Sequence, residues 1–350
     1  MVASDAARAR SVEREGLKSE GPERRGRISP PFKLGFRIAV SVALLVFLIT
    51  KIPADSVTPR NDHPGTIAFL ALGLVMTALG FVLSAWRWQR VLVVFHTHVP
   101  LRTLLSHYLA GQFVGNVLPS TIGGDVLRIS RAAKSTGTAD IAFASVVIER
   151  LSGFIVLPAL TFIGFAIMPS LLDVQHAWIA MGIAIASVVA FVAIVLVAAH
   201  PRLAGRFAER ENWMRFVGAV HIGIDRIRRE PRQALSVLAA AFVYQLSVVL
   251  SVWCAIHTLG VSVPNAAVLA YVPAVASGQV LPISLSGLGI REGLLVLLLH
   301  PLGVPTGRAI GVGLIWYGMM LAVSLFGAPA FAVGHRQSEP EPEPEPAPAP

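Results

Sequence analysis

The sequence predicts an all-α, polytopic integral membrane protein with six full transmembrane helices and two re-entrant hairpins in a 3+3 inverted repeat. The prediction rests on the composition, on the placement of apolar runs and basic loops, and on one repeated motif. Of the 350 residues, 54% are hydrophobic and only 14% are charged. A chain this apolar does not dissolve as one or two soluble domains.

Six apolar runs are long enough to cross a hydrocarbon core, which takes about 20 residues. Trp86 and Trp88 close the second run, where amphipathic rings favour the membrane interface. The six predicted spans are residues 36–52, 66–86, 140–168, 176–199, 233–259 and 306–334.

The two ends of the chain are predicted to be disordered. Residues 1–35 form a basic cytoplasmic leader, and no small-residue cleavage pattern follows Ile52, so we expect an uncleaved anchor and not a signal peptide. Residues 335–350 repeat Glu-Pro and then Ala-Pro, which favours a solvated polyproline II spacer. The folded transmembrane domain is therefore expected at 36–334.

Two interrupted apolar segments, 103–122 and 265–300, decide the topology. If 103–122 were a complete span, the loop 200–232, with eight Arg against four acidic residues, would lie on the opposite side from the basic N-terminus. That arrangement breaks the positive-inside rule. If 103–122 enters from the cytoplasm and turns back, every basic loop and both termini are cytoplasmic. The net charge of +9 then reflects contact with membrane lipids and not with nucleic acid.

A short motif relates the two segments. GNVLP at 115–119 recurs as GQVLP at 278–282, 163 residues later. Adding 163 to the residue numbers of the spans 66–86 and 140–168 gives ranges close to the spans 233–259 and 306–334. Each half, 36–168 and 176–334, has three full crossings, so the second is expected to be inverted. Inverted repeats with broken helices near mid-membrane form the substrate sites of many transporters.

The polar residues of the hairpins predict a cavity, because irregular backbone at membrane depth persists only where protein or water satisfies it. Amide groups at a helix start together with guanidinium groups suit a phosphate-bearing ligand. The predicted backbone-shaping residues are Pro119, Gly123, Gly124, Pro282, Gly287 and Gly289. The candidate substrate-binding residues are Asn116, Ser120, Thr121, Asp125, Arg128, Arg131, Glu149, Arg150, Ser284, Ser286, Arg291 and Glu292.

Structural alternatives remain open for these charges. Asp125 with Arg128 can form a local ion pair, and Arg291 with Glu292 can close the second hairpin against a neighbour. Arg128 and Arg131 can instead anchor lipid headgroups at the surface. Glu149 and Arg150 can neutralise the hairpin residues or relay protons, and the structural role is favoured.

Other chemistry is not indicated by the sequence. Cys254 is the only cysteine, which excludes an internal disulfide and a cysteine-based metal site. His96 and His98 are two residues apart and so fall on different faces of a helix. The chain has no nucleotide-binding GxxxxGK[ST] loop, no GxSxG elbow and no HExxH motif. We therefore predict no metal and no cofactor.

Three ordered motifs resemble a known family. They are N-x-L-P-S with G-G-D-x-x-R within Gly111–Arg131, S-x-x-x-E-R at Ser145–Arg150, and the second hairpin from Pro282 to Gly293. Together they resemble the flippase-like membrane family typified by the N-terminal transmembrane region of lysylphosphatidylglycerol synthases, over about residues 36–334. The resemblance implies a bacterial inner-membrane protein that moves a lipid between leaflets. The aminoacyl-transferase domain of the synthases is missing here, so lysyl transfer is not implied.

Three functions are therefore considered. The leading hypothesis is a lipid translocase in which Ser120, Arg128, Arg131, Ser284 and Arg291 hold a polar or anionic headgroup. The first alternative is an integral-membrane transferase acting on a lipid-linked sugar. The second is a non-transporting subunit that recruits a membrane or soluble enzyme partner through the 200–232 loop or the Glu-Pro tail.

Overall fold

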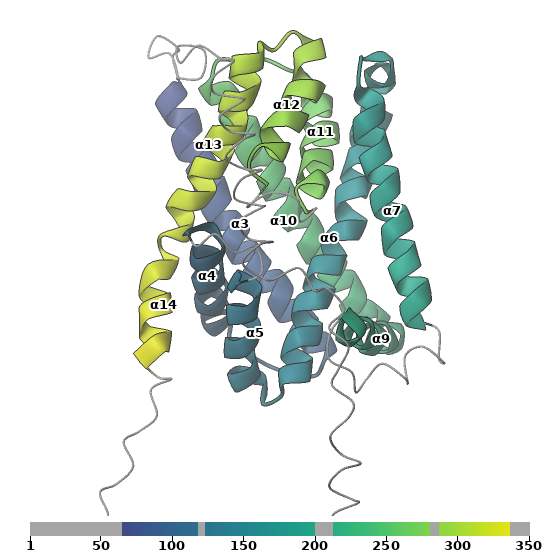
Figure 1. Ribbon diagram of the computed structural model, residues 1–350, viewed down its shortest axis with the longest axis vertical. Coiled ribbons are helices and arrows are strands. Elements are labelled where there is room, and N and C mark those ends of the chain that lie inside the picture. The colour runs from purple at the N-terminus through teal and green to yellow at the C-terminus, as the bar shows by residue number, and fades with distance from the viewer. Residues whose placement is uncertain (1–64, 118–122, 200–212, 281–286, 337–350) are drawn as a thin grey trace, which may run out of the picture. The chain divides into compact units, whose positions relative to one another are not determined.

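The computed structural model describes residues 65–117, 123–199, 213–280 and 287–336, which contain helices and no strand (Figure 1). Five of these helices are long and apolar enough to cross a membrane. They are α3 (Thr66–Val94), α6 (Ala139–Ile167), α7 (Ala177–Ala199), α10 (Pro231–Thr258) and α13 (Thr306–Ser324). The chain is thus a multi-pass membrane protein. The predicted first span at 36–52, the leader and most of the tail lie outside the described residues.

Shorter helices complete the described part of the chain. They are α4 (Leu101–Val117), α5 (Gly123–Thr136), α9 (Trp213–Arg229), α11 (Asn265–Gly278), α12 (Ile290–Leu299) and α14 (Gly327–Arg336), with the 3-10 turns η2 (Pro169–Asp173) and η3 (His300–Leu302). α4 and α5, and likewise α11 and α12, fall short of the about 20 residues that a full span takes. α4 lies largely within the first interrupted segment and α5 begins just after it, whereas α11 and α12 both lie within the second.

Two sequence expectations about the spans are wrong. The predicted run 306–334 is two helices, because Pro329 lacks the N–H that would bond to the Leu325 carbonyl, and α13 ends before it. Trp88 is not an interfacial ring: α3 continues past it to Val94, and its side chain is fully buried and donates to Ser145 Oγ over 2.9 Å. In the interior, the Trp88 ring packs against the guanidinium of Arg128 on α5.

α4 and α5 pack side by side in opposite directions (Figure 1). Tyr108 of α4 lies against Arg128 of α5, and further along α4, Gly111 lies against Gly124. A Cβ on Gly124 would lie 2.4 Å from the Gly111 carbonyl oxygen. The close approach of the two helices therefore requires glycine at 124. α5 begins at Gly123 and carries Asp125 in its first turn, where a carboxylate is favoured by the helix dipole.

α12 begins after a turn formed by glycines. Gly287 and Gly289 have φ of +76° and +86°, in the left-handed region that favours glycine. Glu292 completes the start of the helix, since its Oε2 accepts from the Gly289 N–H over 2.6 Å. α12 packs against both α11 and α13.

α3 and α10 pack against each other in opposite directions along most of their length, with Gly73 beside Cys254, Gly80 beside Ser247 and Arg87 beside Tyr244. The largest apolar cluster is formed mainly by α10, α11, α12 and α13, and a second joins the C-terminal end of α3 to α6 and α9. α7 packs on α6 with one face and leaves Trp178, Ile185, Val189 and Leu196 exposed, as expected of a helix that faces lipid.

Candidate functional site

A cavity of about 340 Å³ lies among helices from both halves of the chain. α4 and α5 contribute Gln112 and Arg128, and the second interrupted segment contributes Ala276, Gln279 and Val280. The remaining lining residues are Met76, Thr77, Gly80, Phe81, Arg87, Tyr108, Glu149, Arg150, Gly153, Phe154, Leu157, Tyr244, Gln245, Val248, Ser251, Trp316 and Met320. Polar and apolar side chains are thus mixed in a region that is surrounded by apolar helices.

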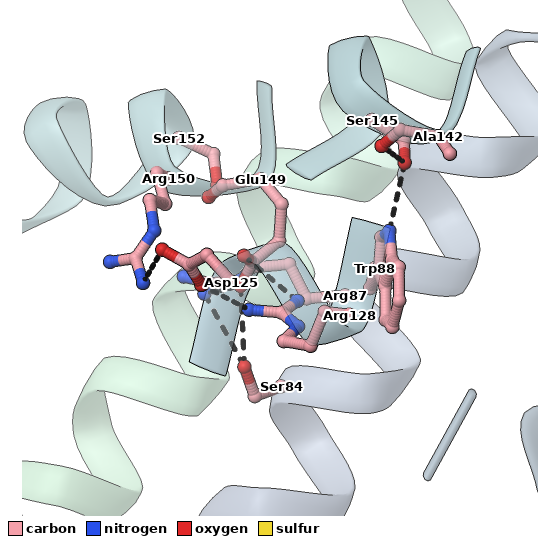
Figure 2. A network of polar contacts seen from close by, with 10 residues as sticks. All are labelled: Ser84, Arg87, Trp88, Asp125, Arg128, Ala142, Ser145, Glu149, Arg150 and Ser152. Carbon is pink, nitrogen blue, oxygen red and sulfur yellow. Dashed lines mark hydrogen bonds and ion pairs between the residues drawn. The ribbon is translucent and has the colours of Figure 1, made fainter. Parts of the chain in front are cut away.

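Glu149 of α6 is the centre of a buried ion network (Figure 2). Its carboxylate contacts the Arg87 guanidinium of α3, and its Oε2 lies 3.3 Å from Arg128 Nη2 of α5. Ser84 adds a hydroxyl 3.3 Å from Oε1. The three charged side chains are 2–6% exposed. Burial of these charges is tolerable only because they are paired and hydrogen-bonded.

Asp125 links this network to one further arginine, Arg150. Its carboxylate contacts the Arg150 guanidinium and lies 3.5 Å from Arg128 Nη1 (Figure 2). The Arg150 side chain is 52% exposed, whereas Asp125 is 23% exposed. The network therefore joins three guanidinium groups to two carboxylates and carries one net positive charge.

Aromatic rings hold the two inner guanidinium groups in place. Arg128 lies over the Trp88 and Tyr108 rings, with its central carbon 4.5 and 4.8 Å from the ring centroids. Arg87 lies 4.5 Å from the centroid of the Tyr244 ring of α10. The Nε atoms of both arginines are buried and have no hydrogen-bond partner among the described residues. Fixed guanidinium groups with unused donors, at the wall of a cavity, suit an anionic ligand.

Arg131 does not line this cavity, although the sequence grouped it with Arg128. Its guanidinium donates to the carbonyl oxygens of Ala330 and Phe331 over 2.8 and 3.0 Å and so holds α14 against α5.

Arg291 and Glu292 form a second buried pair, away from the cavity wall. Both side chains are 0% exposed, and Arg291 Nη2 lies 2.6 Å from Glu292 Oε1. Arg291 also lies beside Trp316 and Tyr317, at 5.7 and 5.1 Å from their ring centroids. Of these four residues, only Trp316 lines the cavity.

The other predicted residues are placed as follows. Asn116 accepts from the Tyr317 hydroxyl with its backbone carbonyl over 3.3 Å, and its side-chain Nδ2 is buried without a partner among the described residues. Pro119, Ser120, Thr121, Pro282, Ser284 and Ser286 lie outside the described residues. Within the part of the chain that the structure describes, no three His, Cys, Asp or Glu side chains are grouped so that they could hold a metal ion.

Sequence reasoning missed Arg87, Ser84, Tyr108 and Tyr244. Arg87 stands between two tryptophans at the end of an apolar run, where a basic residue is usual at the membrane surface. A charge beside an apolar span can also be functional, and that signal could have singled it out. Neither tyrosine carries a local signal, since each meets the arginines only through contacts between helices.

The fold and this cavity define a multi-pass membrane protein with a charged site buried between its helices. The chain matches the family described as Lysylphosphatidylglycerol synthase TM region over residues 35–327. The protein belongs to this family, which confirms the resemblance seen in the sequence motifs. No curated protein matches the chain with significant similarity.

Proposed function

We propose that this protein moves a lipid with a polar or anionic headgroup between the leaflets of the bacterial inner membrane, with membrane lipids as its ligands. The observation that carries the proposal is the cavity itself. It receives residues from both halves of the chain, and it holds buried guanidinium groups in excess of carboxylates. Membership of a family of lipid-synthase membrane regions supports a role that concerns membrane lipids.

The order of the observed helices supports an inverted repeat. The starts of α3 and α10, α4 and α11, α5 and α12, and α6 and α13 are separated by 165, 164, 167 and 167 residues, close to the offset of the repeated motif. Helix contacts agree: α3 packs on α4 and α6 as α10 packs on α11 and α13, and α6 packs on α11 as α13 packs on α4. In our proposal 36–52 supplies a sixth span.

This repeat gives the proposed topology. The α4–α5 hairpin would enter from the cytoplasm and the α11–α12 hairpin from the outside, with both termini cytoplasmic. The basic C-terminal end of α9, with Arg226, Arg228 and Arg229, supports this orientation, because cytoplasmic segments near spans are enriched in Lys and Arg. The two hairpins then approach the same cavity from opposite faces of the membrane.

In this mechanism the headgroup enters the cavity between the halves. Arg87 and Arg128 bind its anionic group, while the acyl chains stay in lipid. Phe154 and Leu157 contribute apolar surface to the same cavity. Rocking of one half against the other would carry the headgroup across, as in other inverted-repeat transporters.

Filling the cavity without removing any of its charges tests this function. Gly153 lines the cavity, and a Cβ there would make only ordinary contacts, 3.7 Å from Gln245 Nε2 and 4.0 Å from Arg87 Nη1. We expect Gly153→Leu to place its side chain in the headgroup path. Movement of phosphatidylglycerol labelled on its acyl chain, measured in vesicles that contain the purified protein, should fall to the rate of protein-free vesicles.

The matched control is Gly182→Leu on α7. A Cβ on Gly182 would meet nothing within 4 Å, and the residue does not line the cavity. This variant should move lipid at the wild-type rate. The proposal fails if wild-type protein moves lipid no faster than protein-free vesicles, or if folded Gly153→Leu moves it as fast as the control does.

A further inference from the structure

We propose that Arg291 is a second headgroup-binding residue, the repeat partner of Arg128, and that the Trp316 ring separates it from the cavity in this structure. The inference rests on the proposed function, since it assigns one arginine to each of the two leaflets between which the lipid moves. The ligand group is the phosphate of a lipid headgroup.

Arg128 and Arg291 occupy equivalent positions in the two halves. They are 163 residues apart, the offset of the GNVLP and GQVLP motifs, and the same offset pairs Tyr108 with Tyr271 and Gly124 with Gly287. Each arginine lies within the first two turns of a short helix, α5 or α12, which is the second helix of its pair. The equivalence therefore extends from sequence to the place of each residue in the fold.

The surroundings of the two arginines also correspond. Arg128 is 2% exposed and Arg291 is 0% exposed. Each is paired with one buried glutamate, Glu149 or Glu292. Each guanidinium lies near one tryptophan ring and one tyrosine ring. The partners come from different positions in the two halves, yet each half provides the same buried guanidinium, carboxylate and aromatic pair.

The two sites differ in their access to the cavity. Arg128 lines it, whereas Arg291 does not; Trp316 lines the cavity, and its ring centroid lies 5.7 Å from the central carbon of the Arg291 guanidinium. Arg291 Nη1 is buried and has no hydrogen-bond partner among the described residues. An unpaired donor on a buried cation is costly, and an anion reaching it from the cavity would satisfy it.

An inverted repeat explains the difference. When the two halves exchange conformations, equivalent residues exchange environments, so Arg128 becomes enclosed and Arg291 is uncovered. In this structure Arg128 of the first half lines the cavity and Arg291 of the second half does not. The headgroup thus passes from one guanidinium to the other during one crossing.

Thiol accessibility tests whether Arg291 is uncovered. Cys254→Ala removes the only cysteine, and Arg291→Cys combined with Glu292→Gln leaves no unpaired buried carboxylate. The reagent is aminoethyl methanethiosulfonate. If exposure occurs through a minor state, the thiol should react about 10- to 1,000-fold more slowly than one at Arg128→Cys. Adding Trp316→Ala should raise the rate at position 291 toward that at position 128.

Leu298→Cys is the matched control, because Leu298 is a fully buried residue of α12 that does not line the cavity. Its thiol should stay unreactive. The proposal is overturned if position 291 reacts no faster than position 298, both with and without Trp316→Ala. Lipid movement by the cysteine-free parent tests the proposed function separately, since position 291 can react in a protein that moves no lipid.

A second variant removes the pair without leaving a charge behind. If Arg291 and Glu292 are only a structural pair, Arg291→Leu with Glu292→Gln should keep stability and keep lipid movement, since replacing both charges of a buried pair is often neutral and Gln keeps an oxygen for the Gly289 N–H. We expect a folded protein whose movement of phosphatidylglycerol falls about ten-fold or more, as a charge-assisted contact is lost. Added inorganic phosphate should not compete; competition would overturn the assignment to a lipid headgroup.

Discussion

Replacing Glu149 with leucine is expected to lower the free energy of unfolding by about 3–5 kcal/mol, the usual cost of removing one partner from a buried ion pair. Glu149 is the carboxylate shared by Arg87 and Arg128. Without it, Arg87 loses its only ion-pair partner among the described residues, and Arg128 keeps only the 3.5 Å contact to Asp125. Unfolding of the full chain in mixed detergent micelles measures the change.

The control for this variant is Asp225→Leu. Asp225 also pairs with an arginine, Arg229 at 2.9 Å, but both side chains are more than half exposed. An exposed pair contributes about 0–1 kcal/mol, so the control should unfold nearly as the wild type does. Equal losses for the two variants would show that Glu149 is not the central charge of a buried network.

Replacing Arg128 with glutamine is expected to slow lipid movement by about ten- to a hundred-fold, the loss that follows when a charge-assisted contact to a phosphate becomes neutral. Stability should change less than for Glu149→Leu, because Arg87 still neutralises Glu149. Lysine at the same position should give an intermediate rate, since an ammonium group keeps the charge but not the planar fork of donors.

Arg229→Gln is the control for the loss of charge alone. Arg229 is an exposed arginine of α9 that does not line the cavity, and this variant should move lipid at the wild-type rate. Wild-type movement by a folded Arg128→Gln protein would remove Arg128 from the headgroup path.

The membrane helices could be predicted from the sequence because lipid imposes long apolar runs. The described residues confirm five such helices, but their ends follow packing and not hydropathy. α3 extends past the predicted end at residue 86 to Val94, since Arg87 and Trp88 are buried against other helices. Window hydropathy cannot distinguish a residue that faces water from one that faces protein.

The charged site could be predicted only in part. Asp125, Arg128, Glu149 and Arg150 stood out as rare charges near apolar runs, and the structure brings them together. Arg131 was grouped with them by its spacing, but it bonds instead to Ala330 and Phe331, about 200 residues later. Arg87 was missed because its partner lies 62 residues away on another helix. Such long-range pairs leave no local pattern in one sequence.

Photocrosslinking within the cavity tests the central claim most directly. A benzoylphenylalanine placed at Gln112, which lines the cavity from α4, should form an adduct with a phospholipid in native membranes, and Arg128→Gln should reduce that adduct. The same probe at Trp178, a 72% exposed residue of α7, should react with surrounding lipid in both backgrounds. Adducts at position 178 alone, or adducts at position 112 that do not depend on Arg128, would contradict a headgroup path through the cavity.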